Sequence, residues 1–354
     1  MAARVMILAG GTGGHVYPAV AVAKNLREKG AEIFWMGTTR GLEAKVVPGE
    51  GFHIDWLKVV GFRGKASLSQ LRAPFVFIRA CYQATAILLK RKPCVVLGMG
   101  GFVAAPGGLM AVMMRIPLVI HEQNRIPGTT NRLLAKIARV VLEAFPGSFD
   151  SGIEAGYSGN PLRKELLHHQ NTQREYGSVP RILVLGGSQG AQILNQVLPK
   201  TLAVFGKPVE VLHQAGIHGL KDTENAYRNL GLKVQVTAFV DDMANAYNWA
   251  DVIVCRAGAM TISELMAIGK PSILVPLPHA IDNHQMRNAE YLADAGGAII
   301  IAQSDLSAEL LATNLQRLVA NQSRLEEMGK AARLLAKLDA TDTVADICLR
   351  VRRT

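Results

Sequence analysis

The chain has 354 residues, a length that predicts two domains rather than a single hydrophobic core. Hydrophobic residues make up 49% of it and charged residues 19%, which argues against a disordered or fibrous protein. The longest apolar stretch, residues 102–120, is broken by Pro106, Arg115 and Pro117, so no membrane-spanning helix is expected.

The net charge of +11 is unevenly distributed along the chain. Residues 1–160 carry 19 Lys and Arg against 9 Asp and Glu, whereas residues 161–354 carry 20 against 19. Between Asp55 and Glu122 there are nine basic residues and no acidic one. This excess predicts a polyanionic partner, either nucleic acid or an acidic membrane surface.

The four cysteines are scattered and form no Cys-x-x-Cys pair, and no two aspartates have the Asp-x-Asp spacing of many metal-dependent sugar transferases. We therefore expect no disulfide framework, no metal site and no cofactor. The first strand begins almost at the N-terminus, which leaves no room for a signal peptide, and a reducing cytosol is the expected compartment.

The predicted elements alternate between short apolar strands and amphipathic helices, which is typical of parallel sheets covered on both faces. The strands expected are 4–9, 33–36, 94–97, 118–120, 181–185, 209–212, 234–237, 252–254 and 272–275, and the helices are 18–29, 68–90, 129–138, 194–205, 261–267 and 285–295. Strands 4–9 and 181–185 both run into glycine-rich turns, which indicates two Rossmann-like halves. Gly and Pro residues in 156–161 predict a linker, with the domain boundary near residue 160.

The glycine turns 10–14 and 186–190 can place backbone N–H groups and a helix N-terminus near a phosphate. A dinucleotide-binding site fits poorly, because Val16 stands where the third glycine belongs and no acidic residue follows the second strand in 36–40. Residues 186–190 also match the Gly-x-Ser-x-Gly pattern of α/β-hydrolases, with Ser188 as nucleophile and Asp251 or Asp282 followed by His284 as partners. That alternative leaves the first 160 residues unexplained.

Residues 249–276 predict a strand, a small-residue turn, a helix and another strand. We place Glu264 in the first turn of this helix, where it complements the helix dipole and could accept hydrogen bonds from ribose hydroxyls.

This segment, together with GGTGGH at 10–15, GMGGFVAAPGG at 98–108, HEQN at 121–124, GNPLR at 159–163 and GGSQGA at 186–191, resembles the MurG family of bacterial N-acetylglucosaminyltransferases, in glycosyltransferase family 28. The resemblance runs in order along essentially the whole chain. It implies the GT-B fold, in which two Rossmann-like domains face each other across a cleft. An acceptor domain of residues 1–160 plus 338–354 would bind lipid I, and a donor domain of residues 161–337 would bind UDP-N-acetylglucosamine (UDP-GlcNAc).

The implied reaction transfers N-acetylglucosamine (GlcNAc), with inversion, to the C4 hydroxyl of N-acetylmuramic acid on undecaprenyl diphosphate, for peptidoglycan synthesis. The resemblance assigns contacts with the donor to Thr12, Gly13, Gly14, Asn124, Arg163, Ser188, Val240, Ala259, Met260, Thr261, Ile262, Ser263, Glu264 and Gln285. Phe102 departs from the family's tyrosine, which puts a phenolic role there in doubt, and Val240 replaces an isoleucine.

An inverting transfer requires one base to take the acceptor proton. His15 is the first candidate, because an imidazole titrates near neutral pH. Glu122, at the carboxyl end of a strand, is the second candidate. His121 is expected to be structural, and a non-catalytic nucleotide-sugar sensor with the same binding residues remains an alternative.

The basic excess suggests where the protein meets its lipid substrate. The helix expected over 68–90 carries apolar residues on more than one face and basic residues beside them, which favours a helix resting on an anionic membrane. Its membrane-facing residues are predicted to be Leu71, Arg72, Phe75, Ile78, Arg79 and Tyr82. No nucleic-acid-binding motif is present and aromatic residues make up only 6%, so nucleic acid is not expected. The expected location is the cytoplasmic face of the bacterial inner membrane, with other cell-wall synthesis proteins as possible partners.

Overall fold

The computed structural model describes residues 2–58, 73–168, 179–187, 190–278 and 283–353. The chain forms two compact units: unit 1 contains residues 1–163 and 337–354, and unit 2 contains residues 164–336. The bounds predicted from the sequence, 1–160 plus 338–354, lie within three residues of these.

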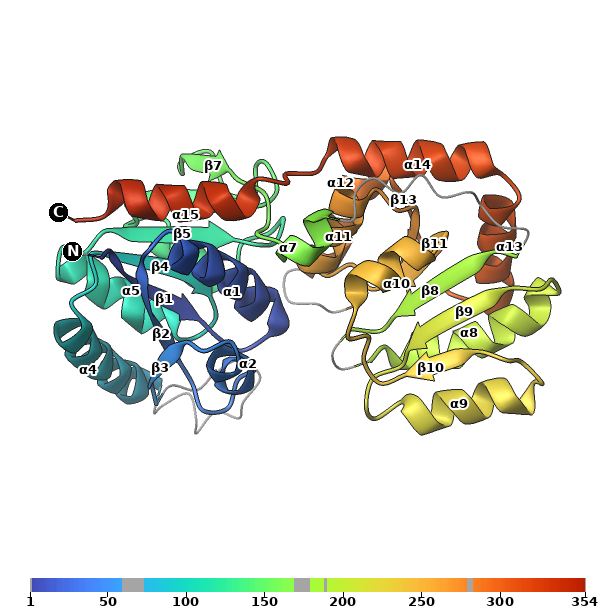
Figure 1. Ribbon diagram of the computed structural model, residues 1–354, viewed down its shortest axis with the longest axis horizontal. Coiled ribbons are helices and arrows are strands. Elements are labelled where there is room, and N and C mark those ends of the chain that lie inside the picture. Colours follow the sequence, from blue (N-terminus) through green and yellow to red (C-terminus); the bar gives the residue numbers. More distant parts are fainter. Residues whose placement is uncertain (1, 59–72, 169–178, 188–189, 279–282, 354) are drawn as a thin grey trace. The chain divides into compact units, whose positions relative to one another are not determined.

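Unit 1 is built on a seven-stranded parallel sheet with the strand order β3-β2-β1-β4-β5-β6-β7 (Figure 1). The strands are β1 (Arg4–Ala9), β2 (Glu32–Gly37), β3 (His53–Trp56), β4 (Val95–Gly100), β5 (Leu118–Glu122), β6 (Val140–Glu143) and β7 (Ala155–Tyr157). The helices are α1 (Gly13–Glu28), α2 (Glu43–Gly49), α4 (Ala73–Arg91), α5 (Ala104–Met113), α6 (Thr129–Leu134) and α15 (Ala340–Val351).

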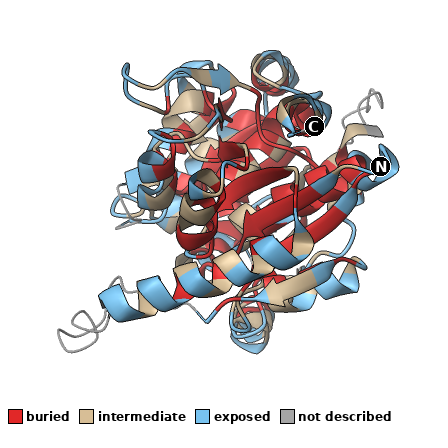
Figure 2. Ribbon diagram, turned by 90° about the vertical axis from the view of Figure 1, so that its left-hand side faces the viewer, coloured by how far each residue is buried: buried red, intermediate tan, exposed pale blue. Residues whose placement is uncertain are grey.

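Alternation along β1 explains why helices cover both faces of this sheet. Val5, Ile7 and Ala9 pack in one core with residues of α1 and α15. Met6 and Leu8 point to the other face and pack in a second core with residues of α4 and α5. Figure 2 shows the buried strands as an interior layer, with exposed residues on the outward surfaces of the helices.

Unit 2 repeats the plan with a six-stranded parallel sheet in the order β10-β9-β8-β11-β12-β13. Its strands are β8 (Arg181–Leu185), β9 (Glu210–Gln214), β10 (Gln235–Thr237), β11 (Val252–Cys255), β12 (Ser272–Leu274) and β13 (Ala298–Ile300). Its helices are α7 (Lys164–His168), α8 (Gln192–Phe205), α9 (Leu220–Asn229), α10 (Met243–Trp249), α11 (Ala259–Ile268), α12 (His284–Asp294), α13 (Ala308–Val319) and α14 (Gln322–Leu334).

Two features predicted from the sequence are wrong: the start of the first helix and the linker at 156–161. Helix α1 begins at Gly13 rather than near Pro18, because Thr12 has an extended backbone and its carbonyl already accepts hydrogen bonds from the N–H groups of His15 and Val16. The segment 156–161 is not a linker: residues 155–157 form β7, and the Asn160 side chain donates to the Gln123 carbonyl within unit 1.

Among the described residues, no helix is both long and apolar enough to cross a bilayer.

Candidate functional site

The first glycine turn places three predicted residues at the carboxyl edge of the unit 1 sheet. Thr12 is the N-cap of α1, and Gly13 and Gly14 are its first two residues. His15, one residue further, lies with its Nδ1 3.5 Å from the Thr12 hydroxyl. A Cβ atom built on Gly100, at the end of β4, would lie 2.8 Å from the His15 Nε2. The imidazole is therefore held between the turn after β1 and the end of the neighbouring strand β4.

Glu122, the second candidate for the base, is 2% exposed at the end of β5. Its Oε1 accepts from the backbone and side-chain amides of Asn124, and its Oε2 accepts from Gly128 N–H and from the Asn131 side chain, at 2.9–3.2 Å. Each carboxylate oxygen thus already has two donors. This geometry favours a role for Glu122 in holding the loop 123–128, with Asn124 in it, over a role in taking a substrate proton.

His121 is fully buried beside Glu122. Its Nε2 lies 2.9 Å from the Gly159 carbonyl, and its Nδ1 lies 3.1 Å from the Gln123 side-chain nitrogen. These partners select the neutral ring, with the proton on Nε2. Burial lowers the pKa of His121 to about 4, in spite of the opposing hydrogen bond to Gly159. The contacts of His121 are those of a structural residue.

Arg163 lies at the end of unit 1 and its side chain is exposed. Its guanidinium carbon lies 5.7 Å from the centre of the Tyr17 ring, which belongs to α1. Arg163 therefore lies beside α1, the helix that begins in the first glycine turn, although about 150 residues separate that turn from Arg163 in the sequence.

In unit 2, α11 begins at Ala259, directly after β11 and the N-cap Gly258. Ala259, Met260 and Thr261 form the first turn, whose N–H groups and dipole favour an anion. The prediction that Glu264 lies in this first turn is wrong, because it is the sixth residue of the helix. The carboxylate of Glu264 is instead oriented by buried Tyr247, whose hydroxyl donates to Glu264 Oε2 at 2.8 Å.

Helix α12 lies beside this helix start. The Asn288 side chain donates to the Ala257 carbonyl at 3.3 Å, and Gln285 accepts from Leu277 N–H at 2.9 Å. Asn288 thus ties α12 to the residue two positions before α11, and Gln285 bonds the segment after β12. Ile262 and Ser263 are buried and pack within the unit.

Val240 lines a cavity of about 730 Å³ beside strands β9 and β10. Its wall combines aromatic, amide and charged residues, among them Phe239, Trp249, Asn245, Glu210, Lys233, Asp241 and Asp242. Such a cavity can hold a planar ring with a few polar edges.

Ser188 lies outside the described residues. The hydrolase alternative can still be tested on Asp251, which accepts a hydrogen bond from Arg181 N–H at 2.8 Å. Both residues lie at the amino ends of parallel strands, β11 and β8, whereas the turn 186–190 follows the carboxyl end of β8. Asp251 is therefore at the opposite edge of the sheet and cannot serve a nucleophile in that turn. No cluster of His, Cys, Asp and Glu suited to a metal ion occurs among the residues that the structure describes.

Helix α4 has one buried face and one exposed face. Ala80, Ala84 and Leu88 are buried, whereas Phe75, Ile78 and Tyr82 are 75%, 64% and 78% exposed. Arg79 is exposed on the same side, and Leu71 and Arg72 lie outside the described residues.

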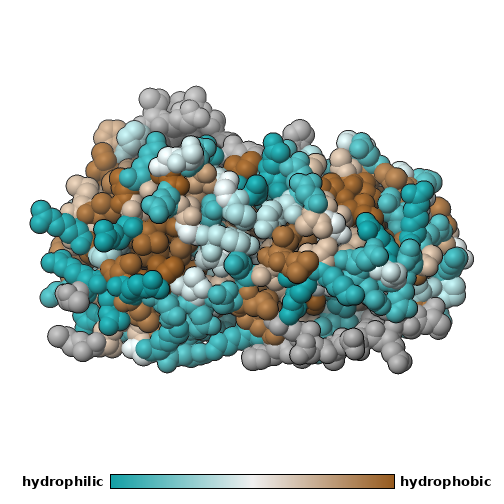
Figure 3. All heavy atoms as spheres, turned by 90° about the horizontal axis from the view of Figure 1, so that it is seen from above, coloured by the Kyte–Doolittle hydropathy of each residue, from teal (hydrophilic) through white to brown (hydrophobic). Residues whose placement is uncertain are grey.

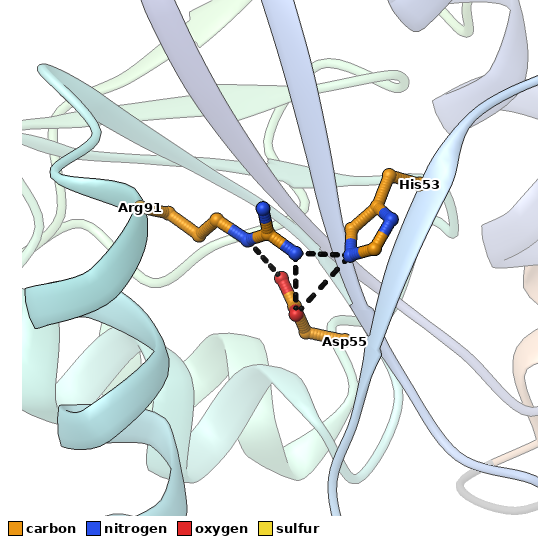
Figure 4. A network of polar contacts seen from close by, with 3 residues as sticks. All are labelled: His53, Asp55 and Arg91. Atoms are coloured by element: carbon orange, nitrogen blue, oxygen red, sulfur yellow. Dashed lines mark hydrogen bonds and ion pairs between the residues drawn. The ribbon is translucent and has the colours of Figure 1, made fainter.

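A polar network fixes the C-terminal end of α4 to the edge strand β3 (Figure 4). Two nitrogens of Arg91 donate to the Asp55 carboxylate at 2.8 and 2.9 Å, and Arg91 also contacts the His53 ring. Burial alone would raise the pKa of Asp55, but the hydrogen bonds and charge of Arg91 bring it below its ordinary value. The helix is therefore anchored at one end while Phe75, Ile78 and Tyr82 remain exposed.

The sequence contained no signal for Tyr247 or Asn131, although these residues orient Glu264 and Glu122. Their partners are 17 and 9 positions away and are reached only through the fold. Glu143 was also missed: this buried carboxylate accepts from the N–H groups of Gly147 and Ser148.

GT-B glycosyltransferases are built from two parallel-sheet units of this kind, each with a glycine-rich turn after its first strand. The model of the glycosyltransferase family 28 N-terminal domain matches residues 5–143, and that of the family 28 C-terminal domain matches residues 181–344. The chain belongs to glycosyltransferase family 28.

Several transferases are similar to this chain over almost its full length. It is 55% identical, over 99% of both chains, to the UDP-N-acetylglucosamine--N-acetylmuramyl-(pentapeptide) pyrophosphoryl-undecaprenol N-acetylglucosamine transferase of Methylococcus capsulatus. It is 48% identical, over the full length of both, to the protein of the same name from Ectopseudomonas mendocina.

Among solved structures, MurG of Acinetobacter baumannii matches with a TM-score of 0.83 and 37% identity, over 98% of this chain and 99% of that one. The glycosyltransferase of kitacinnamycin matches with a TM-score of 0.75 but only 18% identity, over the whole of both chains, which shows a shared fold alone.

Proposed function

We propose that this protein transfers GlcNAc from UDP-GlcNAc to the C4 hydroxyl of N-acetylmuramic acid in lipid I, and so forms lipid II. The observation that carries this proposal is the identity of 47–55% to transferases of that name along the whole chain. The reaction is a hexosyl transfer in peptidoglycan synthesis, and it consumes no cofactor.

Unit 2 is the proposed donor-binding domain. The uracil would occupy the cavity beside Val240, the diphosphate would approach the N-terminus of α11 and residues 186–190, and Glu264 would accept from the ribose hydroxyls. Gln285 would contact the transferred sugar. The helix N-terminus supports this assignment, because its N–H groups can stabilise the charge of a departing diphosphate without a metal ion.

Unit 1 is the proposed acceptor domain, with His15 as the base that takes the proton of the attacking hydroxyl. Its place between Thr12 and Gly100 supports this role, since the ring lies at the carboxyl edge where parallel sheets bind their ligands. Thr12, Gly13, Gly14 and Asn124 would line the sugar site, and Arg163 would contact the phosphates.

We infer that the exposed face of α4 attaches the protein to an anionic membrane at the cytoplasmic side of the inner membrane. Phe75, Ile78 and Tyr82 would enter the headgroup region, with Arg79 close to lipid phosphates. Exposed apolar residues alone do not identify such a surface: Figure 3, viewed from above Figure 1, shows apolar atoms scattered among hydrophilic ones. The difference at α4 is that its exposed apolar residues are spaced along a single helix, and that this helix lies in the part of the chain with the basic excess. Other cell-wall synthesis proteins remain possible partners of the attached enzyme.

The decisive experiment incubates the purified protein with UDP-GlcNAc and a short-chain lipid I analogue, and measures UDP release and the disaccharide product. Release that requires both substrates is expected. A nucleotide-sugar sensor would bind UDP-GlcNAc without product, and a hydrolase would release UDP without the acceptor; either result would contradict the proposal.

A further inference from the structure

Glu43, the first residue of α2, is a completely buried carboxylate. Its Oε2 accepts from Gly11 N–H at 2.8 Å. Its Oε1 accepts from the Thr38 N–H at 2.9 Å and from the Thr38 hydroxyl at 2.7 Å. These three donors are neutral groups that belong to two different turns, the one after β1 and the one after β2.

Glycines surround this carboxylate on three sides. A Cβ atom added to Gly10 would lie 2.7 Å from Glu43 Oε1, one added to Gly37 would lie 2.8 Å from its Cγ, and one added to Gly41 would collide with Oε2. Any side chain at these positions would displace the carboxylate. The absence of side chains there lets Glu43 reach the first glycine turn.

Residues of the segment 38–43 form hydrogen bonds with both polar backbone groups of Gly11, the N–H and the carbonyl. Glu43 accepts from its N–H, and Leu42 N–H donates to its carbonyl at 3.2 Å. Gly11 has a φ of +94°, a conformation that favours glycine and that these two contacts maintain. The next residue, Thr12, caps α1, and His15 lies in the first turn of that helix.

The burial of this carboxyl group serves the geometry of the turns more than the stability of the fold. Removing a carboxyl group from water costs free energy that a well-packed apolar residue would not cost. The two carboxyl oxygens of Glu43 accept from all three donors and so join the two turns through one side chain. In dinucleotide-binding sheets an acidic residue after the second strand binds a ribose. Here the acidic residue, six positions after β2, turns towards the protein's own glycine turn.

We propose that Glu43 is a positioning residue for the transfer reaction: it holds the turn 10–12 in the shape that sets His15 and the start of α1 against the acceptor. The proposal rests on the proposed function for the role of His15. It also means that the Gly11 N–H is engaged within the protein and does not bind a substrate phosphate.

The test compares Glu43→Gln with wild type. Glutamine has the same size, but its Nε2 is a donor that would face Gly11 N–H or the Thr38 N–H, so the turn must shift. We expect kcat to fall about 10- to 100-fold, since a displacement of about 1 Å can cost that much. The affinity for UDP, whose uracil and ribose we assign to unit 2, should change less than about twofold.

Two further variants refine the test. Thr38→Val removes one of the three donors and should give a smaller loss of kcat, and its effect should not add to that of Glu43→Gln. Glu50→Gln is the matched control, because Glu50 ends the same helix on the surface, beside Lys24, and should leave kcat unchanged. If Glu43→Gln does not fold, Thr38→Val carries the test.

A folded Glu43→Gln with wild-type kcat would overturn the proposal, as would a loss of kcat matched by an equal loss of folded protein. The ¹⁵N signals of the His15 ring, assigned with His15→Ala, give a readout independent of turnover and should move in Glu43→Gln. If wild type makes no lipid II the proposed function is wrong, and unmoved His15 signals would then refute the positioning role separately.

Discussion

Three buried carboxylates organise the loops at the carboxyl edge of the unit 1 sheet. Glu43, Glu122 and Glu143 are each 5% exposed or less, and each accepts backbone N–H groups of two residues. Loops rich in glycine have few side chains with which to fix their shape, so acceptors from neighbouring strands and helices supply it. The candidate residue Asn124 lies on a loop of this kind, and His15 lies in the first turn of the helix that follows one.

His15→Ala should lower kcat by about 100-fold or more while the affinity for UDP stays within about twofold, because the imidazole acts on the acceptor proton. Steady-state kinetics with the short-chain acceptor, and UDP titration by calorimetry, measure the two quantities. Near-wild-type turnover would remove His15 from the role of base. Glu122→Gln would then be the variant to examine.

Gly100→Ala should also lower kcat, by about 10-fold or more, because the added methyl group would lie 2.7 Å from the His15 Cδ2. Gly100 has a φ of +102°, so backbone strain must be separated from displacement of the ring. Gly147→Ala is the matched control: its φ is +73°, but nothing lies within 4 Å of the added Cβ. Equal effects of the two substitutions on kcat would contradict contact with His15.

At the scale of elements, α4 and α15 show two uses of an amphipathic helix. Among the side chains of α4 that the structure describes, Ala80, Ala84 and Leu88 are buried. The Arg91–Asp55 ion pair holds the end of the helix, and its other side is exposed. Helix α15 instead brings Val344, Ala345 and Cys348 into the core that β1 and α1 form. Polar contacts lock it in place: Asn25 donates to Asp342 at 2.9 Å, and Lys29 pairs with Asp342 and Asp346.

Phe75→Glu combined with Tyr82→Glu should release the protein from vesicles of anionic phospholipid, because the change removes apolar area and adds negative charge. Flotation with anionic and neutral vesicles, at low and high salt, measures the bound fraction. Leu334→Glu is the control, since Leu334 is 87% exposed but lies on α14 in unit 2. Equal binding of the double variant and wild type would contradict attachment through α4.

Val344→Ala should destabilise unit 1 by about 2 kcal/mol, the ordinary cost of removing methyl groups from a packed core. Urea unfolding of a Trp249→Phe background reports on unit 1, because Trp35 and Trp56 both lie there. Val204→Ala, in which Val204 is 49% exposed on α8, should leave the midpoint unchanged. No shift with Val344→Ala would mean that α15 contributes little to unit 1.

At the scale of the whole molecule, the described part of each unit contains a fully enclosed neutral histidine. His121 belongs to unit 1; His213, in unit 2, lies 2.8 Å from the Tyr227 hydroxyl and 3.1 Å from Asn195 Oδ1. Burial lowers the pKa of both to about 4, from 6.5 for an accessible imidazole. Between pH 6.5 and 4 the unfolded chain therefore binds protons that the folded protein does not, and the free energy of unfolding must fall as the pH falls.

The expected loss between pH 7 and pH 5 is about 2 kcal/mol for each of these histidines. His213→Gln should remove that share of the pH dependence, because glutamine keeps the polar contacts and does not titrate. Urea unfolding at both pH values measures it, with His218→Gln, at an exposed position, as the control. A pH dependence that His213→Gln leaves unchanged would show that burial does not set the protonation of His213.

Much of the fold was predictable because parallel strands buried on both faces appear as short apolar runs. Every strand predicted from such a run is present, from β1 to β12. The strands that were missed, β3, β6, β7 and β13, have three or four residues each, and β3 and β7 are at sheet edges with little burial. The start of α1 was misplaced because Pro18 resembles a first helical residue, whereas here it lies inside the helix.

The sequence by itself determined the two-unit parallel architecture, the two glycine turns and the family, because apolar periodicity and motif order are properties of neighbouring residues. Tertiary structure alone decided what each polar group does. Glu122, a candidate base from the sequence, is the centre of a hydrogen-bonded loop, Glu264 is oriented by Tyr247, and Glu43 accepts from the turn before His15. The physical reason is that a buried carboxylate takes its role from donors brought to it by other strands and helices, and no local pattern in the sequence specifies them.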